Sequence, residues 1–267
     1  MMRRLLQFTL STAILCALTA VPAFAQSFPS QTVRIVVPYA AGGSTDVLAR
    51  ALARELNAAW GHPVLVENIP GADSTIGASR VATASPDGHT LLLTIDPTVV
   101  GNRFLFKKLP YDPDKSLIPI TMLARSGSFV IVHPSVPANN LRELVEMARG
   151  APGKIAYGSV GRGTPAHLVL ETIGRREGVS FIHVPYKGVA PATTAVVAGE
   201  VSVSVASPAA TGAMVRAGKV RAIAITSPNR TSLFPDVPST VESGYPYVIS
   251  WIWFGLFAPG GTNPQIV

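Results

Sequence analysis

The sequence predicts an α/β fold, because short apolar runs rich in β-branched residues alternate with longer runs of helical periodicity. The strand-like runs are residues 33–37, 64–67, 90–95, 118–124, 129–132, 154–158, 181–184, 201–205 and 221–226. The helix-like runs are residues 45–60, 75–84, 141–150, 165–178, 190–198 and 209–217. Proline and glycine fall between these runs and mark turns. This alternation favours parallel sheets covered by helices, with functional loops at the carboxyl ends of the strands.

The first 25 residues have the pattern of a secretory leader. Arg3 and Arg4 give a basic start, an apolar stretch follows, and cleavage is predicted after Ala25, so that the mature chain begins at Gln26. The single cysteine, Cys16, lies inside this leader. The mature chain is therefore expected to have no disulfide framework and no cysteine metal site.

The charge of the chain is basic but dispersed. The net charge is +7, and removal of the two leader arginines lowers it to +5. Lys107-Lys108 and Arg175-Arg176 are the adjacent basic pairs after the leader, and no basic and aromatic surface accompanies them, so nucleic acid is not an expected partner. A modest positive field favours anionic ligands.

The first loop, residues 39–46, follows a predicted strand and precedes a predicted helix. Pro38 ends the strand, and Gly42-Gly43 allow a tight turn. The next three residues, Ser44-Thr45-Asp46, are of N-cap type, so a helix N-terminus faces outward here. Such a turn binds a carboxylate or phosphate well, but a purely structural turn fits the same pattern.

Two further loops carry small and polar residues, the second loop at 68–77 and the third loop at 158–167. The third loop repeats the logic of the first, because glycines precede an N-cap type, Thr164, and then Pro165 at the favoured first helical position. Two such sites in separate halves predict a ligand with two ends between two lobes. A duplicated fold with one site gives the same pattern.

The chain has no nucleotide-binding P-loop, no nucleophile elbow and no zinc-type histidine spacing. His62, His89 and His133 lie beside turn residues and are expected to be solvated, and His183 fits a satisfied core or rim position. His167 either orients the third loop or touches a ligand. Asp46, Asp73 and Asp96 follow three different predicted strands, so catalytic carboxylates stay an alternative. Helix capping also explains Asp46, and turn chemistry also explains Asp73.

The last residues begin a helix pattern at 262–265 that ends after two more residues. This pattern predicts that the chain is cut short relative to a full domain.

Several segments together resemble one family. VPYAAGGSTDVLAR, VENIPGA, SPDGHTLL, YGSVGRGTPAH, VPYKG, RAIAITSPNR and FPDVPSTVESGY are similar, in this order, to the Bug family of periplasmic solute-binding proteins of tripartite tricarboxylate transporters. The resemblance implies a two-lobed periplasmic binding fold of type II, crossed twice by the chain, with the C-terminal part of lobe one truncated. It also implies a periplasmic location, no catalysis, no cofactor or metal, a small carboxylate ligand and transmembrane transporter subunits as partners. We expect a monomer, with residues 27–124 and 228–267 in lobe one and 125–227 in lobe two.

The resemblance also assigns ligand-binding residues by position. The first loop would hold one carboxylate, the second loop would support the ligand through ordered water, and the third loop would close from the other lobe. The expected ligand-binding residues are Tyr39, Gly43, Ser44, Thr45, Asp46, Ser74, Asp96, Ser159, Gly161, Gly163, Thr164, His167, Tyr186 and Ser207. Tyr186 either walls the cleft or packs at the hinge, and Ser207 is a further candidate wall.

Asp96 departs from what a dicarboxylate alone requires. A buried acid beside an anionic ligand is unfavourable unless it meets a cation. We therefore hypothesise that the ligand carries an ammonium group, as an acidic or amidated amino acid does. Arg162 reaches a second carboxylate or is a solvated loop residue. Competing functions are a ligand sensor for a membrane signalling protein and a secreted hydrolase or lyase.

Overall fold

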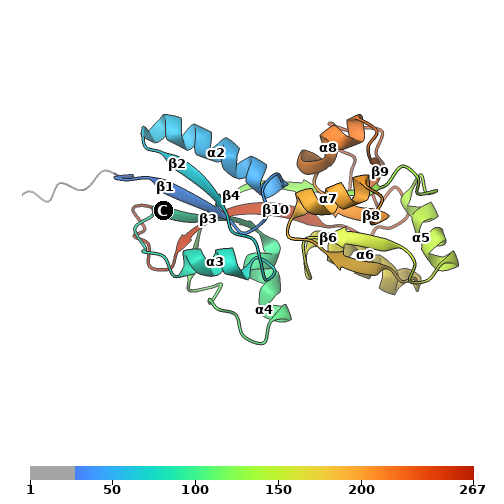
Figure 1. The fold of residues 1–267 in the computed structure, drawn as a ribbon, viewed down its shortest axis with the longest axis horizontal. Helices are drawn as coiled ribbons and strands as arrows, with labels where there is room; N and C mark the ends of the chain where they lie inside the picture. The colour runs from blue at the N-terminus through green and yellow to red at the C-terminus, as the bar shows by residue number, and fades with distance from the viewer. Residues whose placement is uncertain (1–27) are drawn as a thin grey trace, which may run out of the picture. The chain divides into compact units, whose positions relative to one another are not determined.

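A computed structural model describes residues 28–267, which form two five-stranded mixed sheets with helices packed on their faces (Figure 1). The predicted leader, with Cys16 and the cleavage site after Ala25, lies outside the described residues. Among the helices that the structure describes, none combines the length and the apolar character needed to cross a membrane.

Lobe one is built on the sheet with strand order β2-β1-β3-β10-β4. Its strands are β1 (Val33–Val37), β2 (Val64–Asn68), β3 (Thr90–Ile95), β4 (Leu117–Gly127) and β10 (Trp251–Pro259). The first three are parallel, whereas β10 is antiparallel to both β3 and β4. The helical segments are α2 (Ser44–Trp60), α3 (Thr75–Ala82), the π-helix η1 (Pro97–Gly101) and α4 (Asn102–Leu105).

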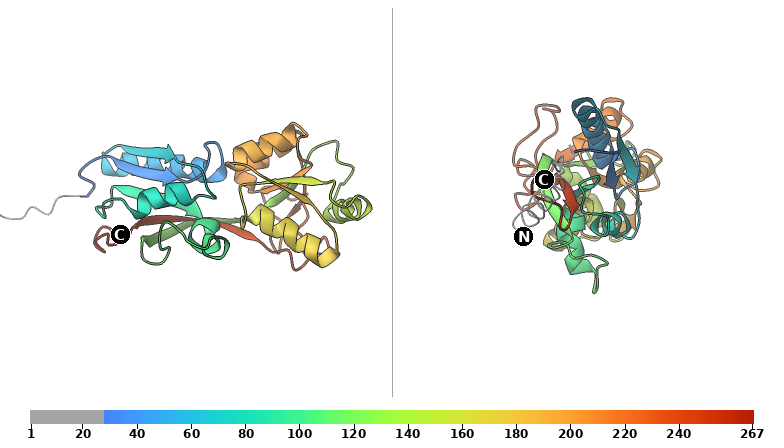
Figure 2. Two further views of the ribbon diagram at one scale, coloured as in Figure 1. Left: turned by 60° about the horizontal axis from the view of Figure 1, so that its bottom comes forward. Right: turned by 90° about the vertical axis from the view of Figure 1, so that its left-hand side faces the viewer.

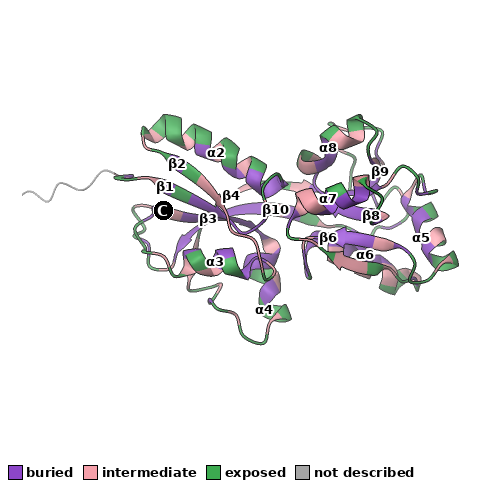
Figure 3. Ribbon diagram, in the orientation of Figure 1, coloured by how far each residue is buried: buried purple, intermediate pink, exposed green. Residues whose placement is uncertain are grey.

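Helices α2 and α3 cover opposite faces of this sheet. Because side chains alternate along a strand, Ile35 packs in the core beneath α2 while Val36 packs in the core beneath α3. Ala53 of α2 and Val81 of α3 are the matching buried helix positions. The helices carry buried inner faces and exposed outer faces (Figure 3), as the amphipathic spacing predicts.

Lobe two is built on the sheet with strand order β7-β6-β8-β5-β9. Its strands are β5 (Phe129–Val132), β6 (Ala156–Ser159), β7 (Ile182–Pro185), β8 (Val203–Ala206) and β9 (Arg221–Ile225). β6 is parallel to β7 and β8, and β5 is antiparallel to β8 and β9. The helices are α5 (Leu141–Gly150), α6 (Pro165–Glu177), α7 (Val189–Val197) and α8 (Pro208–Arg216). Each sheet therefore contains the parallel strands that the alternation of strands and helices predicts, and antiparallel pairs that the sequence reasoning did not specify.

The chain passes from lobe one to lobe two between β4 and β5 and returns before β10, as two views of the ribbon show (Figure 2). Thr226, which is fully buried, ties the two crossings together. Its hydroxyl accepts the Ser128 N–H at 2.9 Å and donates to the Ser250 carbonyl at 2.7 Å. Its own N–H donates to the Ser128 carbonyl, and its carbonyl accepts from the Ser250 N–H.

The lobe boundaries follow from these contacts. Ile225 N–H donates to the Pro238 carbonyl at 2.9 Å, and the ring of Phe234 lies edge-on to Phe129 at a centroid distance of 5.0 Å. Val248 is buried in the core of lobe two. We therefore propose that residues 228–250 belong to lobe two and that lobe one resumes at β10, in place of the expected boundary at residue 228.

Two local expectations differ from the structure. Residues 262–265 form turns and no helix, and Thr262 donates its hydroxyl to the Pro259 carbonyl at 2.7 Å. His89 was expected to be solvated but is buried, because it leads directly into β3 and its backbone carbonyl accepts from Arg34 N–H of β1.

Candidate functional site

The first loop joins β1 to α2, and the start of this helix is buried and has no side-chain cap. The N-cap is Gly43, in extended conformation and without a side-chain cap, and Ser44 is the first helical residue. The expectation that Ser44, Thr45 or Asp46 caps the helix was therefore wrong. The first N–H groups of a helix have no partner within it, so they remain available for an anion. Ser44 is 3 % exposed and its hydroxyl has no hydrogen-bond partner in the described structure.

The carboxylate of Asp46 is committed to holding the first loop. It accepts from Gly42 N–H at 2.9 Å and from Arg50 Nε at 3.0 Å, and Arg50 Nη2 forms an ion pair with it at 2.9 Å. Burial alone would raise the pKa of Asp46, but the bonds from Arg50 and Gly42 outweigh it and lower the pKa. Asp46 thus stabilises the turn, and its contact with a ligand stays a prediction.

A cluster of hydroxyls, centred on Thr98 of η1, connects the first loop to the second. Thr98 Oγ1 lies 3.0 Å from Tyr39 Oη, 2.8 Å from Ser74 Oγ and 2.5 Å from Thr94 Oγ1. Burial raises the pKa of Tyr39 to about 12. Sequence reasoning singled out Tyr39 and Ser74 as ligand-binding residues, but the structure shows that both hydroxyls already have hydrogen-bond partners. Sequence reasoning did not identify their shared partner, Thr98.

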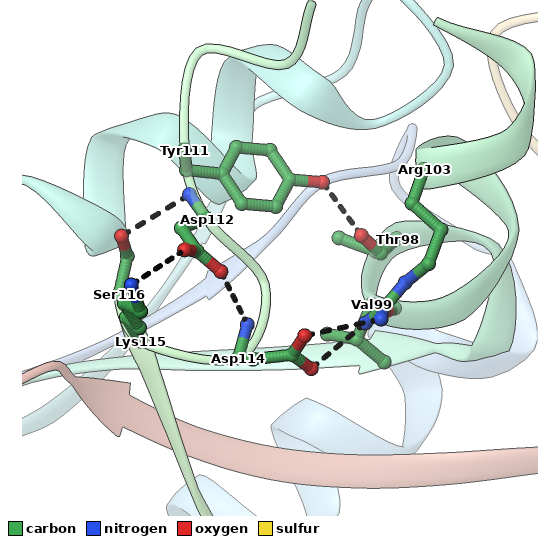
Figure 4. Close-up of polar contacts among 8 residues, drawn as sticks. All are labelled: Thr98, Val99, Arg103, Tyr111, Asp112, Asp114, Lys115 and Ser116. Atoms are coloured by element: carbon green, nitrogen blue, oxygen red, sulfur yellow. Dashed lines mark hydrogen bonds and ion pairs between the residues drawn. The ribbon is translucent and has the colours of Figure 1, made fainter.

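A loop after α4 holds the π-helix in place (Figure 4). Tyr111 donates its hydroxyl to the Thr98 carbonyl at 2.6 Å. Arg103 donates to both carboxylate oxygens of Asp114, at 2.9 and 3.1 Å, and to the Val99 carbonyl at 2.9 Å. These contacts fix η1, whose first turn follows Asp96 and carries Thr98. π-Helical turns are frequent at functional sites.

Asp96 is the N-cap of this π-helix and is partly buried, with its Oδ1 shielded from solvent. Its Oδ1 has no hydrogen-bond partner among the described residues. Burial raises the pKa of Asp96 to about 7. A buried carboxyl with a free oxygen is a functional-site candidate, because it gains from a cation or a donor that the protein does not supply.

The third loop is held from inside by hydroxyls. Thr164, the N-cap of α6 with Pro165 behind it as predicted, donates its hydroxyl to the Gly161 carbonyl at 2.7 Å. Ser159 Oγ accepts from Gly161 N–H at 3.0 Å. Gly161 and Gly163 have positive φ values of 123° and 70°, which explains the glycines.

A pair of histidines lies behind the third loop. His183 Nε2 lies 2.6 Å from Ser159 Oγ, and His167 Nδ1 accepts from Gly163 N–H at 3.4 Å. The two rings are 4.7 Å apart, and burial lowers the pKa of both. The bond to Gly163 requires a bare Nδ1, so neutral imidazole is the form that orients the loop.

The loops of the two lobes meet. Ala40 N–H donates to the Lys187 carbonyl at 3.1 Å. A Cβ built on Gly161 would overlap Asp73 Oδ1, far inside the 3.0 Å below which real Cβ atoms are essentially never found. A Cβ on Gly163 would lie 2.8 Å from Leu105 of α4. The glycines of the third loop therefore permit the close approach of lobe one.

A pocket of about 660 Å³ opens between the lobes at these loops. Tyr39, Asp73 and Ser74 line it from lobe one, and Tyr186 and Lys187 line it from lobe two. Tyr186 also donates its N–H to the Ser159 carbonyl at 2.8 Å, so its backbone supports the third loop while its side chain walls the pocket. Lys187 is the one basic side chain among the lining residues; it lies in the VPYKG segment but was not among the expected ligand-binding residues.

The expected wall residue Ser207 has a counterpart that sequence reasoning missed. Ser207 is the N-cap of α8, and Ser128 lies at the crossing from β4 to β5. Both side chains are buried, and both hydroxyls lack a hydrogen-bond partner within residues 28–267. Ser128 follows a glycine between two strands and belongs to no motif, so only the structure identifies it.

Asp46, Asp73 and Asp96 form no hydrogen bond or ion pair with one another in the described part of the chain. Across residues 28–267, no cluster of three or more His, Cys, Asp or Glu side chains is placed to hold a metal ion.

Two α/β lobes joined by two crossings, with a pocket lined by residues of both lobes, define the class of two-lobed solute-binding proteins. A profile described as the tripartite tricarboxylate transporter family receptor matches residues 48–267. BugT of Bordetella pertussis is 36% identical over 250 residues, which cover 93% of this chain and 76% of BugT. A protein encoded in the gbd 5′ region of Cupriavidus necator is 38% identical over 252 residues, covering 94% of this chain and 76% of that protein.

Solved structures agree with this assignment. The periplasmic binding protein BugD superposes with a TM-score of 0.85 at 36% identity, covering 90% of this chain and 80% of BugD. MatC from Rhodopseudomonas palustris with bound malate gives a TM-score of 0.85 at 35% identity, covering 90% and 81%. A further R. palustris protein with adipate gives 0.87 at 31% identity, covering 90% and 80%. The chain belongs to the tripartite tricarboxylate transporter receptor family, which includes the Bug proteins.

Proposed function

We propose that this chain is a periplasmic receptor that captures a small carboxylate and presents it to a tripartite tricarboxylate transporter. The candidate ligands are a dicarboxylate, a tricarboxylate or an acidic amino acid. The observation that carries the proposal is a pocket between the lobes, which Tyr39 and Ser74 line from lobe one and Lys187 lines from lobe two. The family membership and the malate and adipate bound to two structural relatives support it.

The proposed mechanism is closure of the lobes around the ligand. The N–H groups at the start of α2 and the free Ser44 hydroxyl would satisfy one carboxylate. The third loop, held by Thr164 and Ser159, would close over the other side. Ligand binding would then shift an equilibrium from open to closed lobes, and the transporter would recognise the closed form. Tyr39, Asp46 and Ser74 would contribute by fixing the loops.

Asp96 supports a ligand that also carries an ammonium group. Its unpaired Oδ1 and raised pKa mean that a cation brought by the ligand would gain a partner and restore ionisation. Titration calorimetry with succinate and aspartate tests this, because aspartate should bind more tightly and lose that advantage in Asp96→Ala. Equal affinity for the two, unchanged by the substitution, discards the ammonium.

The test of the receptor function starts with whatever copurifies with the protein. Mass spectrometry after denaturation should recover a small carboxylate unchanged, whereas a product of that carboxylate would favour an enzyme. Calorimetry with malate, succinate, adipate and aspartate should then give saturable binding at one site. Thr164→Val removes the hydroxyl bond to Gly161 and should weaken binding, while Thr83→Val on the exposed end of α3 is the matched control. Absence of binding to every carboxylate would refute the proposal.

The leader and the oligomeric state are two further parts of the proposed function. We infer that the leader is cleaved after Ala25 and that the receptor acts as a monomer. The mass of the protein purified from the periplasmic fraction should match a chain that begins at Gln26, and sedimentation should give a single monomeric species.

A further inference from the structure

A small cavity lies between the lobes beside the crossing strands. Its volume is about 20 Å³, much smaller than the open pocket. Ile95 and Ile252 line it from lobe one, Ser128 lines it at the crossing, and Thr164, Val189 and Ser207 line it from lobe two. Val160 borders both this cavity and the open pocket, so the two spaces are neighbours.

The cavity contains hydrogen-bonding capacity that the protein leaves unused. The side chains of Ser128 and Ser207 belong to residues that are 1 % and 2 % exposed, and neither hydroxyl has a partner within the described residues. Their backbone groups are engaged elsewhere, since Ser128 N–H donates to Thr226 Oγ1 and the Ser207 carbonyl accepts from Thr211 Oγ1. Buried polar groups without partners are rare in folded proteins, and two beside one cavity indicate a polar group that completes them.

The field at the cavity favours an oxygen acceptor. Three helices of lobe two begin at its wall, because Thr164 and Ser207 are the N-caps of α6 and α8, and Val189 is the first residue of α7. These helices have 13, 9 and 9 residues, so each has a full N-terminal turn. Helix N-termini stabilise negative charge and disfavour cations. The cavity has no Lys, Arg, Asp or Glu among its lining residues, so hydroxyls and helix dipoles alone make the selection.

The size of the cavity limits what it can hold. A space of about 20 Å³ accommodates roughly one water-sized group and is too small for a whole carboxylic acid. We propose that Ser128 and Ser207 form an end-group subsite that binds a terminal oxygen of the captured ligand, opposite the end bound by the first loop. This inference rests on the proposed receptor function and adds a rule of specificity, namely that ligands ending in a methyl group are rejected.

The test compares ligands that differ at one end only. Succinate with butyrate, and adipate with hexanoate, are measured by calorimetry on the purified protein. A site built to hydrogen-bond a terminal oxygen rejects an analogue that lacks this oxygen. In the pair whose chain length fits the site better, the diacid should therefore bind at least about 100-fold more tightly than the monoacid. Ser128→Ala and Ser207→Ala should each weaken diacid binding roughly tenfold, and the double variant should reduce the ratio within the pair.

The controls separate this subsite from a structural role and from the receptor function itself. Ser180→Ala, at an exposed position of lobe two, should leave affinity unchanged. The ligand-free Ser128→Ala and Ser207→Ala proteins should melt no lower than the wild type, because the removed hydroxyls bond nothing. If the wild type binds malate or aspartate but neither succinate nor adipate, the subsite fails and the receptor function stands; if it binds no carboxylate at all, both fail. If it binds diacids while the serine variants keep the wild-type affinity and ratio, the cavity holds only water and the subsite alone is refuted.

Discussion

Gly161→Ala should weaken ligand binding because it blocks the approach of the lobes. Gly161 has a φ of 123°, and a Cβ there would overlap Asp73 Oδ1 of lobe one. The substitution therefore has two effects. Backbone strain, roughly 1–3 kcal/mol, acts whenever lobe two is folded, whereas the overlap with Asp73 acts only when the lobes are together.

The magnitude follows from the second effect. Overpacking of this kind costs about 1–3 kcal/mol, and it falls on the ligand-bound closed state alone. Because 1.4 kcal/mol is a factor of ten in an equilibrium constant, the dissociation constant should rise roughly 5- to 150-fold. Calorimetry with the diacid that binds the wild type most tightly measures this directly, and urea unfolding of the ligand-free protein measures the strain.

Two further variants isolate the overlap. Gly178→Ala places a side chain at a φ of 65° with nothing within 4 Å, so it should lower stability and leave affinity unchanged. Asp73→Gly removes the overlapped carboxylate at a residue whose φ of 50° suits glycine, so it should restore much of the affinity of Gly161→Ala. Wild-type affinity in Gly161→Ala, or no rescue by the second substitution, would show that this contact plays no part in binding.

Three other predictions concern stability and pH. Thr226→Val leaves the Ser128 N–H and the Ser250 carbonyl without their hydrogen-bond partner. It should lower the free energy of unfolding, measured in urea, by about 2–4 kcal/mol. A loss below about 1 kcal/mol would contradict the role of Thr226 at the crossings. The pKa of Asp96 is raised to about 7, so between about pH 4 and 7 the carboxyl is protonated in the folded protein and ionised in the unfolded protein, and the stability of the protein falls as pH rises through that range. Asp96→Asn should therefore melt at a higher temperature than the wild type at pH 8 but not at pH 4. Each kcal/mol of stability gained should raise the melting temperature by roughly 2–4 °C. His167 has a lowered pKa and orients the third loop when it is neutral. The affinity for the diacid should therefore be constant above about pH 6.5 and decrease only at lower pH. An equal decrease at low pH in His167→Asn would contradict this role of His167.

The elements that sequence reasoning located best are those whose signals are local. The bounds of β1, β3, β5 and α5 match the prediction, because a β-branched run between turn residues or a capped amphipathic repeat identifies itself. The side chain of Asn140 caps α5 by accepting from Glu143 N–H at 2.9 Å, which is such a local signal.

The antiparallel strands could not be predicted in the same way. β10 pairs with β3 and β4, which precede it by more than 100 residues, and its aromatic alternation indicates a strand without indicating a partner. Each sheet contains one strand, β10 in lobe one and β5 in lobe two, that follows a crossing between the lobes and runs antiparallel to its neighbours. No local sequence pattern encodes the direction of such a strand. The proposed placement of residues 228–250 in lobe two also depends on contacts between distant parts of the chain, such as that of Phe234 with Phe129.

The candidate site divides along a similar line, and the division has a physical cause. The glycine turns were predictable because backbone conformation and helix capping depend on a few adjacent residues. Whether a hydroxyl is free depends on which side chains the fold brings near it. Tyr39 and Ser74 are occupied by Thr98, whereas Ser128 and Ser207 are left open at the cavity. Under the proposed function, the backbone turns would supply affinity for any small carboxylate, and selection among carboxylates would fall to the few buried polar atoms that the fold leaves unpaired within the described residues.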